Sequence, residues 1–213
     1  MDLRARKREL RKAMVERILA LDPADRRTHE ANLAARFTSL PGFAAAKSVL
    51  LYATAFPEEI ATQSMLEVAL EQGKHLVCPR VDRVQRRLRL YRVGDLNTDF
   101  KRGMLGIPEP HDGCPEVEPE QVDWVLVPGL AFDARGYRIG RGAGHYDRLL
   151  PTLRHDVPRW ALAFDCQMVD ALPVEPHDVS LDGVVSPGTT VVCPRPEDTG
   201  ANPVWRDDDS DRA

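Results

Sequence analysis

The chain has 213 residues, 43% of them hydrophobic, which is enough apolar content for the core of one globular domain. Its 29 lysines and arginines stand against 33 aspartates and glutamates, and a formal net charge of −4 indicates neither nucleic acid nor an anionic membrane as a partner. No apolar run approaches the roughly 20 residues of a membrane span, and residues 1–17 are charged throughout, so we expect no signal peptide and a cytoplasmic protein. We also expect a monomer.

The apolar residues near the start of the chain recur at the spacing of a helix over residues 3–21. Its first half is strongly basic, with Arg4, Arg6, Lys7, Arg8, Arg11 and Lys12. A run of this kind is most often a solvated face. The alternative is contact with a nucleotide, because Lys7 and Arg11 are one helical turn apart and share a face.

A second helix is predicted to begin at Pro23, with Asp22 as its N-cap, and to end at Pro41-Gly42. Residues 47–53 form an apolar run that is typical of a central strand in a parallel sheet. The loop after this strand leads to a predicted helix over residues 60–72, and it is a candidate ligand loop because ligands bind at the carboxyl ends of such strands. Of its two glutamates, Glu58 and Glu59, we expect one to complement the helix dipole in the first turn.

Further strands are predicted over residues 75–79, 87–91 and 159–165, with a proline- and acid-rich connector over 113–121. Strands that alternate with helical stretches predict a three-layer α/β/α fold with a mainly parallel sheet. Residues 1–193 are expected to form this single domain, and residues 194–213, rich in Pro, Asp and Arg, a disordered acidic tail. The cysteines have no C-x-x-C spacing, so they predict free thiols and no zinc site: Cys78, Cys114, Cys166 and Cys193.

Residues 122–150 are the most informative stretch of the chain. An apolar strand is followed by four glycines interleaved with three arginines, and then by the start of a helix at His145. Glycines let a backbone approach an anion, and helix N-termini and arginines attract it, so the pattern favours a phosphate site. The alternative is a loop that only makes turns, since neither the G-x-x-x-x-G-K-[ST] nor the G-x-G-x-x-G signature is present.

Within this stretch, residues 128–133 (PGLAFD), 136–142 (GYRIGRG), Gly144 and 146–148 (YDR) resemble the signature of the 5-formyltetrahydrofolate cyclo-ligase family, also called 5,10-methenyltetrahydrofolate synthetase. Two positions depart from the family pattern: Ala143 stands where Gly or Lys is usual, and His145 where Tyr is common. Weaker matches in the same order occur at residues 7–11, 59–62, 79–81, 106–110, 173–178 and 181–185. The resemblance implies a Rossmann-like version of the α/β/α fold.

The resemblance also implies which residues contact each ligand. For ATP these are Lys7, Arg8, Arg11, Arg138, Ile139, Gly140, Arg141, Gly142, Ala143, Gly144, His145 and Tyr146. For the reduced folate they are Thr54, Glu59, Arg141, Gly142, Ala143, Gly144 and His145. Magnesium would be held by Asp147 and Asp182, although a helix-turn acid and a turn residue are the ordinary roles of such aspartates. Arg141 and Tyr146 would be catalytic.

The implied reaction joins ATP and 5-formyltetrahydrofolate to give 5,10-methenyltetrahydrofolate, ADP and phosphate, with Mg²⁺ as cofactor. The sequence leaves two other functional classes open. One is a non-catalytic relative that binds ATP or folate, which Ala143 and His145 favour, and the other is a sugar-phosphate enzyme on a similar scaffold. For His145, we expect a mostly neutral ring that contacts folate and is not a general base.

Overall fold

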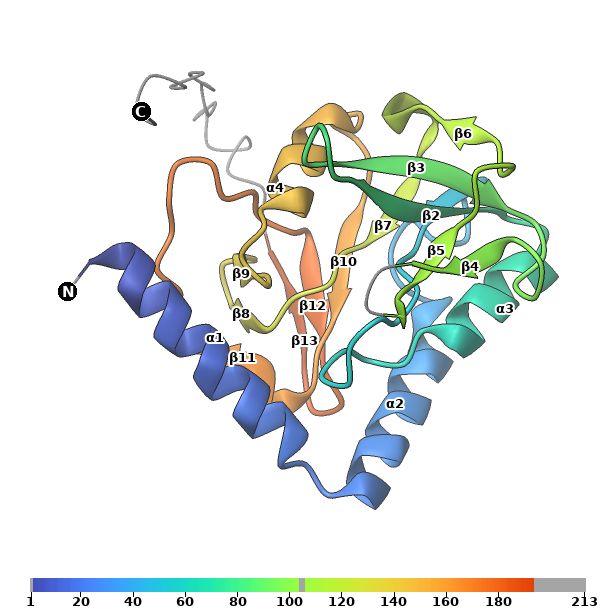
Figure 1. Ribbon diagram of the computed structural model, residues 1–213. Helices are drawn as coiled ribbons and strands as arrows, with labels where there is room; N and C mark the ends of the chain where they lie inside the picture. Colours follow the sequence, from blue (N-terminus) through green and yellow to red (C-terminus); the bar gives the residue numbers. More distant parts are fainter. Residues whose placement is uncertain (1, 104–105, 194–213) are drawn as a thin grey trace, which may run out of the picture.

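The computed structural model describes residues 2–103 and 106–193, and Figure 1 shows the arrangement of their elements. The predicted acidic tail, residues 194–213, lies outside the described residues. Within the described part of the chain, no helix is long and apolar enough to cross a membrane. All four cysteines are free thiols, as the sequence predicted.

Aspartate side chains cap the first two helices, and the second begins at Pro23, as the sequence predicted. The first, α1 (Leu3–Leu19), is capped by the Asp2 side chain, and α2 (Pro23–Phe37) by Asp22, which accepts the N–H groups of Ala24 and Asp25. The predicted end at Pro41-Gly42 is too late, because α2 stops at Phe37 and short turns follow. The remaining helices are α3 (Gln63–Glu71) and α4 (His145–Leu149).

The main sheet has eight strands in the order β13-β12-β10-β7-β1-β2-β3-β6. Their bounds are β1 (Ser48–Leu50), β2 (His75–Asp82), β3 (Arg87–Val93), β6 (Glu116–Val117), β7 (Trp124–Leu126), β10 (Arg159–Leu162), β12 (Gly183–Val185) and β13 (Thr190–Val192). The five strands from β12 to β2 run parallel, and antiparallel strands flank them on both sides. The predicted mainly parallel Rossmann-like α/β fold is therefore confirmed.

Successive residues of the central strands face opposite layers, as the two-residue period of a strand requires. On β7, Trp124 and Leu126 pack toward α1, α2 and α3, whereas Val125 packs toward α4 and the turn after it. Figure 1 shows the same division, with α1, α2 and α3 on one side of the sheet and α4 on the other. Edge-to-face contacts of Trp124 with the rings of Phe37 and Phe43, at 5.7 and 5.3 Å between centroids, anchor α2 to the sheet.

Two small sheets lie outside the main one. Strands β8 (Ala131–Asp133), β9 (Arg138–Ile139) and β11 (Met168–Val169) form one of them, and β4 (Phe100–Arg102) pairs with β5 (Pro108–Pro110) to form the other. One expectation is thereby corrected. A β8–β9 hairpin separates β7 from the glycine-rich loop, because hydrogen bonds between Ala131–Phe132 and Arg138–Ile139 close the chain on itself.

The order of the sheet places a switch point between β1 and β7. The chain proceeds from β1 outward through β2 to β3, and then returns to the other side of β1 for β7, β10 and β12. Crossovers on either side of such a point leave a crevice outside the carboxyl ends of the two strands. The residues that follow β1 and β7 are therefore expected to line a ligand site.

Candidate functional site

A cavity of about 670 Å³ lies at this switch point. The segments after β1 and β7 and the strand β2 form its floor, with Tyr52, Phe56, Pro79 and Leu130 among the lining residues. Its walls come from the basic side of α1, the glycine-rich loop, the start of α4 and the segment 175–178. A volume of this size is within the range of pockets that hold metabolites.

The buried carboxylate of Asp133 fixes the hairpin that leads into the glycine-rich loop. Its oxygens accept the backbone N–H groups of Arg135, Tyr137 and Leu172 at 3.0–3.2 Å and the guanidinium of Arg135. Beyond the hairpin, Gly142 has a φ of 104°, and a Cβ there would stand 3.2 Å from Cζ of Arg11. Glycine at this position therefore lets the loop and α1 approach closely at the cavity.

Arg138 and Tyr146 bring unsatisfied polar groups to the cavity. Arg138 is buried and donates from Nη2 to Asp147 Oδ1 at 2.9 Å, and its guanidinium lies 5.9 Å from the centre of the Tyr146 ring. In the described part of the chain, Arg138 Nε and the Tyr146 hydroxyl are buried without a hydrogen-bond partner. Since buried polar groups are normally paired, these two atoms are available for hydrogen bonds to a polar ligand in the cavity.

Arg141 crosses the cavity from the glycine-rich loop to the loop after β1. It pairs with the carboxylate of Glu58, which is 4% exposed, and its guanidinium lies 3.5 Å from the centre of the Phe56 ring. Neither contact is visible in the sequence pattern. The expectation that one of the two glutamates lies in the first turn of α3 is wrong, because that helix begins only at Gln63.

Glu59 lines the cavity, as expected for a substrate-binding residue. Its Oε2 accepts the N–H groups of Ala55 and Phe56 at 2.8 and 3.3 Å. Burial raises the pKa of Glu59, and these two hydrogen bonds oppose the shift only in part. Thr54, by contrast, does not line the cavity: its hydroxyl donates to the carbonyl of Ile60 and accepts from the N–H of Thr62, so it shapes the loop from within.

The basic face of α1 lines the cavity. Arg8 and Arg11 face it as expected, and so does Arg4, which sequence reasoning missed although it is one turn before Arg8. Arg11 Nε donates to the carbonyl of Gly140 at 2.9 Å. Lys7 also reaches the cavity, but its ammonium is held between Glu175 Oε2 at 2.8 Å and Asp178 Oδ2 at 2.6 Å.

The Lys7 ion pairs involve three largely buried charges. Burial lowers the pKa of Lys7, but the hydrogen bonds that its ammonium donates to Asp178 and Glu175, together with their negative charges, outweigh burial, so that the net shift is upward. The ammonium is therefore charged throughout the physiological range, and it pairs with both acids, which approach α1 from 168 and 171 residues away.

The structure does not bring the two expected magnesium ligands together at the cavity. Asp147 lines it, whereas Asp182 does not. Asp182 precedes β12, and its carboxylate accepts the N–H of Arg159 at the start of the parallel strand β10. It therefore lies at the amino ends of the strands, at the opposite edge from the cavity. The acids that do line the cavity with Asp147 are Glu59, Glu109, Glu175 and Asp178.

His145 lies at the start of α4 and lines the cavity. Burial, and then the charge of Arg148, lowers its pKa from the usual value. The direction agrees with the neutral ring expected from the sequence. Ala143, Gly144 and the other loop residues expected to contact ligands also line the cavity: Ile139, Gly140, Arg141 and Gly142.

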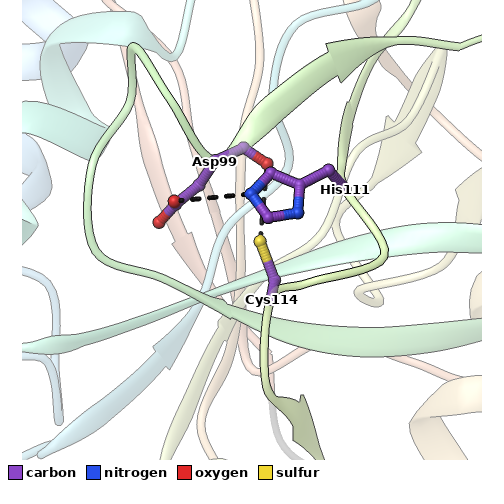
Figure 2. A group of neighbouring side chains, drawn as sticks. All are labelled: Asp99, His111 and Cys114. Carbon is purple, nitrogen blue, oxygen red and sulfur yellow. Dashed lines mark hydrogen bonds and ion pairs between the residues drawn. The ribbon is translucent and has the colours of Figure 1, made fainter.

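A second group of side chains lies at the base of the β4–β5 hairpin, where Asp99, His111 and Cys114 have ligand-type atoms within 4.8 Å of one another (Figure 2). Nδ1 of His111 accepts the N–H of Gly113 at 2.8 Å, although a metal-bound imidazole normally donates from its second nitrogen. Burial and the charge of Asp99 raise the pKa of Cys114, which favours a thiol over the thiolate that binds metals. We interpret the group as a hydrogen-bonded network that fixes this hairpin.

The fold and the cavity together define an α/β protein with an arginine-lined cavity at the switch point of its sheet. Comparison with known proteins identifies the family of the chain. A sequence model of the 5-formyltetrahydrofolate cyclo-ligase family matches residues 3–187. The 5-formyltetrahydrofolate cyclo-ligase of Escherichia coli (strain K12) is 30% identical over 174 residues, which cover 81% of this chain and 95% of that protein.

Two further relatives agree with this result. The 5-formyltetrahydrofolate cyclo-ligase of Mycolicibacterium smegmatis is 35% identical over 138 residues, covering 62% of this chain and 70% of that protein. The solution structure of Aquifex aeolicus 5,10-methenyltetrahydrofolate synthetase has a TM-score of 0.77 and 30% identity, covering 96% of this chain and 98% of the other. The chain belongs to the 5-formyltetrahydrofolate cyclo-ligase family, as its 128–148 motif indicated.

Proposed function

We propose that this protein catalyses the ATP- and magnesium-dependent conversion of 5-formyltetrahydrofolate to 5,10-methenyltetrahydrofolate, with release of ADP and phosphate. The observation that carries the proposal is the asymmetry of the cavity. Arg4, Arg8 and Arg11 of α1 and the arginines of the glycine-rich loop provide cations for a triphosphate. The loop after β1 provides Phe56 and Glu59, an aromatic ring and a carboxyl group suited to a heterocycle with N–H donors.

The reaction needs alignment and charge neutralisation more than a covalent nucleophile. The formyl oxygen attacks the γ-phosphorus of ATP and ADP leaves, which turns a poor leaving group into a phosphate ester of an iminium-like carbon. N10 of the folate then attacks that carbon and releases its proton to solvent, and the C–O bond breaks as phosphate departs. Each transfer places negative charge on phosphate oxygens, so cationic donors at the cavity favour both steps.

We assign Arg138 and Arg141 to stabilise the negative charge on the phosphate oxygens. Arg138 is buried, oriented by Asp147, and has an Nε atom without a partner in the described chain. Arg141 is held by Glu58 and Phe56 between the two walls of the cavity, where the two substrates would meet. The Tyr146 hydroxyl is the second unpaired donor, and because burial raises its pKa it stays protonated and can donate to a transferring oxygen.

Magnesium fits this cavity because oxygen ligands are abundant there, and bound with ATP it would shield the phosphate charge during transfer. Of the expected pair, Asp147 lines the cavity and is the carboxylate we propose to hold the ion together with phosphate oxygens. Glu175 and Asp178 are further carboxylates that line the cavity, and both pair with Lys7.

The test is an absorbance assay for the methenyl product, run with purified protein, ATP and 5-formyltetrahydrofolate, with and without a chelator. We expect product formation that depends on both ATP and magnesium. Binding of ATP and folate without product would establish the alternative of a non-catalytic relative. Turnover that persists in excess chelator would contradict the magnesium assignment. We also expect a monomer, which sedimentation would check.

A further inference from the structure

Arg26 of α2 is in contact with the loop that carries Glu58 and Glu59, although it does not itself line the cavity. Its Nη1 donates to the carbonyl of Pro57 at 2.5 Å and its Nη2 to the carbonyl of Glu59 at 2.6 Å. The two carbonyls flank Glu58, so one planar guanidinium holds the backbone on both sides of the residue that pairs with Arg141.

Glu30, one helical turn after Arg26, completes this contact. Its Oε1 accepts Arg26 Nε at 3.1 Å and also the N–H of Ala61 at 3.2 Å. The guanidinium lies 5.3 Å from the centre of the fully buried ring of Phe164, which limits its position from a further side. Both charged side chains are mostly buried, with 22% and 18% of their surfaces exposed.

We propose that Arg26 and Glu30 form a bracket that positions Glu59 for the reaction. The inference rests on the proposed function, because it assigns these two α2 residues a part in that chemistry. The loop turns back on itself between Phe56 and Glu59, and its own hydrogen bonds leave the Pro57 and Glu59 carbonyls to the bracket. Without the guanidinium, two carbonyls lose their donor and the loop is free to shift relative to the floor of the cavity.

The expected signature is selective loss of function on the folate side. Arg26→Ala should lower kcat/KM for 5-formyltetrahydrofolate by about 100-fold, the scale of a 1 Å displacement of a positioned group. The KM for ATP should stay within about twofold, because α1 and the glycine-rich loop are not part of the bracket. Arg26→Lys should restore part of the lost kcat/KM, since an ammonium can replace one of the two donors but not the planar pair of donors of a guanidinium.

A double-mutant cycle identifies the residue through which Arg26 acts. In a Glu59→Gln background, Arg26→Ala should cost no more than about threefold, because the group it positions is already altered. Glu30→Gln keeps the oxygen that accepts from Arg26 and Ala61, so it should retain most activity, whereas Glu30→Ala should not. Arg27→Ala is the matched control: Arg27 is the exposed neighbour on the same helix, and its loss should change neither parameter.

Amide hydrogen exchange gives a readout that does not depend on activity. Arg26→Ala should speed exchange at Ala61 and Glu59, with α1 unaffected. If the unaltered protein shows no turnover, the proposed function fails, and exchange in the variant still decides whether the bracket holds the loop. Equal losses for folate and ATP, additive effects in the Glu59→Gln background, or unchanged exchange would each overturn the positioning role. If Arg26→Ala does not fold, the same kinetic and exchange measurements on Arg26→Lys test the proposal.

Discussion

Replacement of Asp133 by asparagine is expected to lower the free energy of unfolding by about 2–4 kcal/mol. The carboxylate is completely buried and accepts from three backbone N–H groups and from the guanidinium of Arg135. It ties the end of β8 to Tyr137, before β9, and to Leu172. The hairpin it holds delivers Arg138 and the glycine-rich loop to the cavity, so its loss affects both stability and catalysis.

The magnitude of this destabilisation follows from the number of donors that an asparagine would leave without an acceptor. An asparagine has one oxygen, so its NH₂ group must face either the N–H of Leu172 with the Arg135 guanidinium, or the N–H groups of Arg135 and Tyr137. The guanidinium can turn to solvent because the Arg135 side chain is 52% exposed, but the N–H of Leu172 is buried. One orphaned buried donor costs about 1–3 kcal/mol, and losing the charge of the acceptor adds about 1 kcal/mol.

Thermal unfolding measures this cost. At roughly 2–4 °C per kcal/mol for a domain of this size, the melting temperature should fall by roughly 10 °C. Asp156→Asn is the control, because Asp156 is an exposed residue whose change should leave the melting temperature nearly unaltered. A loss below about 1 kcal/mol for Asp133→Asn would refute the reasoning, since it would mean that the buried donors find other acceptors.

Three further predictions concern the cavity. Arg11→Ala should weaken ATP binding by about 1–3 kcal/mol in calorimetry and leave folate binding alone; an unchanged ATP affinity would return α1 to a solvated basic face. Asp147→Asn should remove most turnover with the melting temperature preserved, and near-normal rates at limiting magnesium would contradict the metal assignment. His145→Tyr should keep turnover and shift mainly the folate KM. Because the pKa of His145 is lowered in the folded protein, the unfolded chain binds the proton first. Unfolding measured from pH 8 to 5 should therefore lose stability below about 6.5, less so in His145→Tyr.

The sequence by itself determined the local structure and the family. Asp22-Pro23 located the start of α2, the apolar runs located β1 and β7, and the spacing of glycines and arginines after residue 133 located the wall of the cavity. These features depend on neighbours within a few residues, where capping, backbone freedom and side-chain period act directly. The resemblance at residues 128–148 added the activity that the cavity is now proposed to have.

Only the tertiary structure decided which side chains meet. Lys7 pairs with Glu175 and Asp178, Arg141 with Glu58, and Arg26 with the carbonyls of the loop after β1. Such pairings follow from the order of strands in the sheet, which places the ends of β1 and β7 side by side although more than 70 residues separate them.

The same order separates the two aspartates that the family pattern offered as magnesium ligands. Asp147 comes after β7 and the β8–β9 hairpin in the chain and lies at the carboxyl edge of the sheet, whereas Asp182 comes before β12 and lies at the amino edge. A motif gives residue types along the chain but not the edge of the sheet that each one reaches. That edge depends on the direction and register of each strand, which long-range packing of the two apolar faces of the sheet sets.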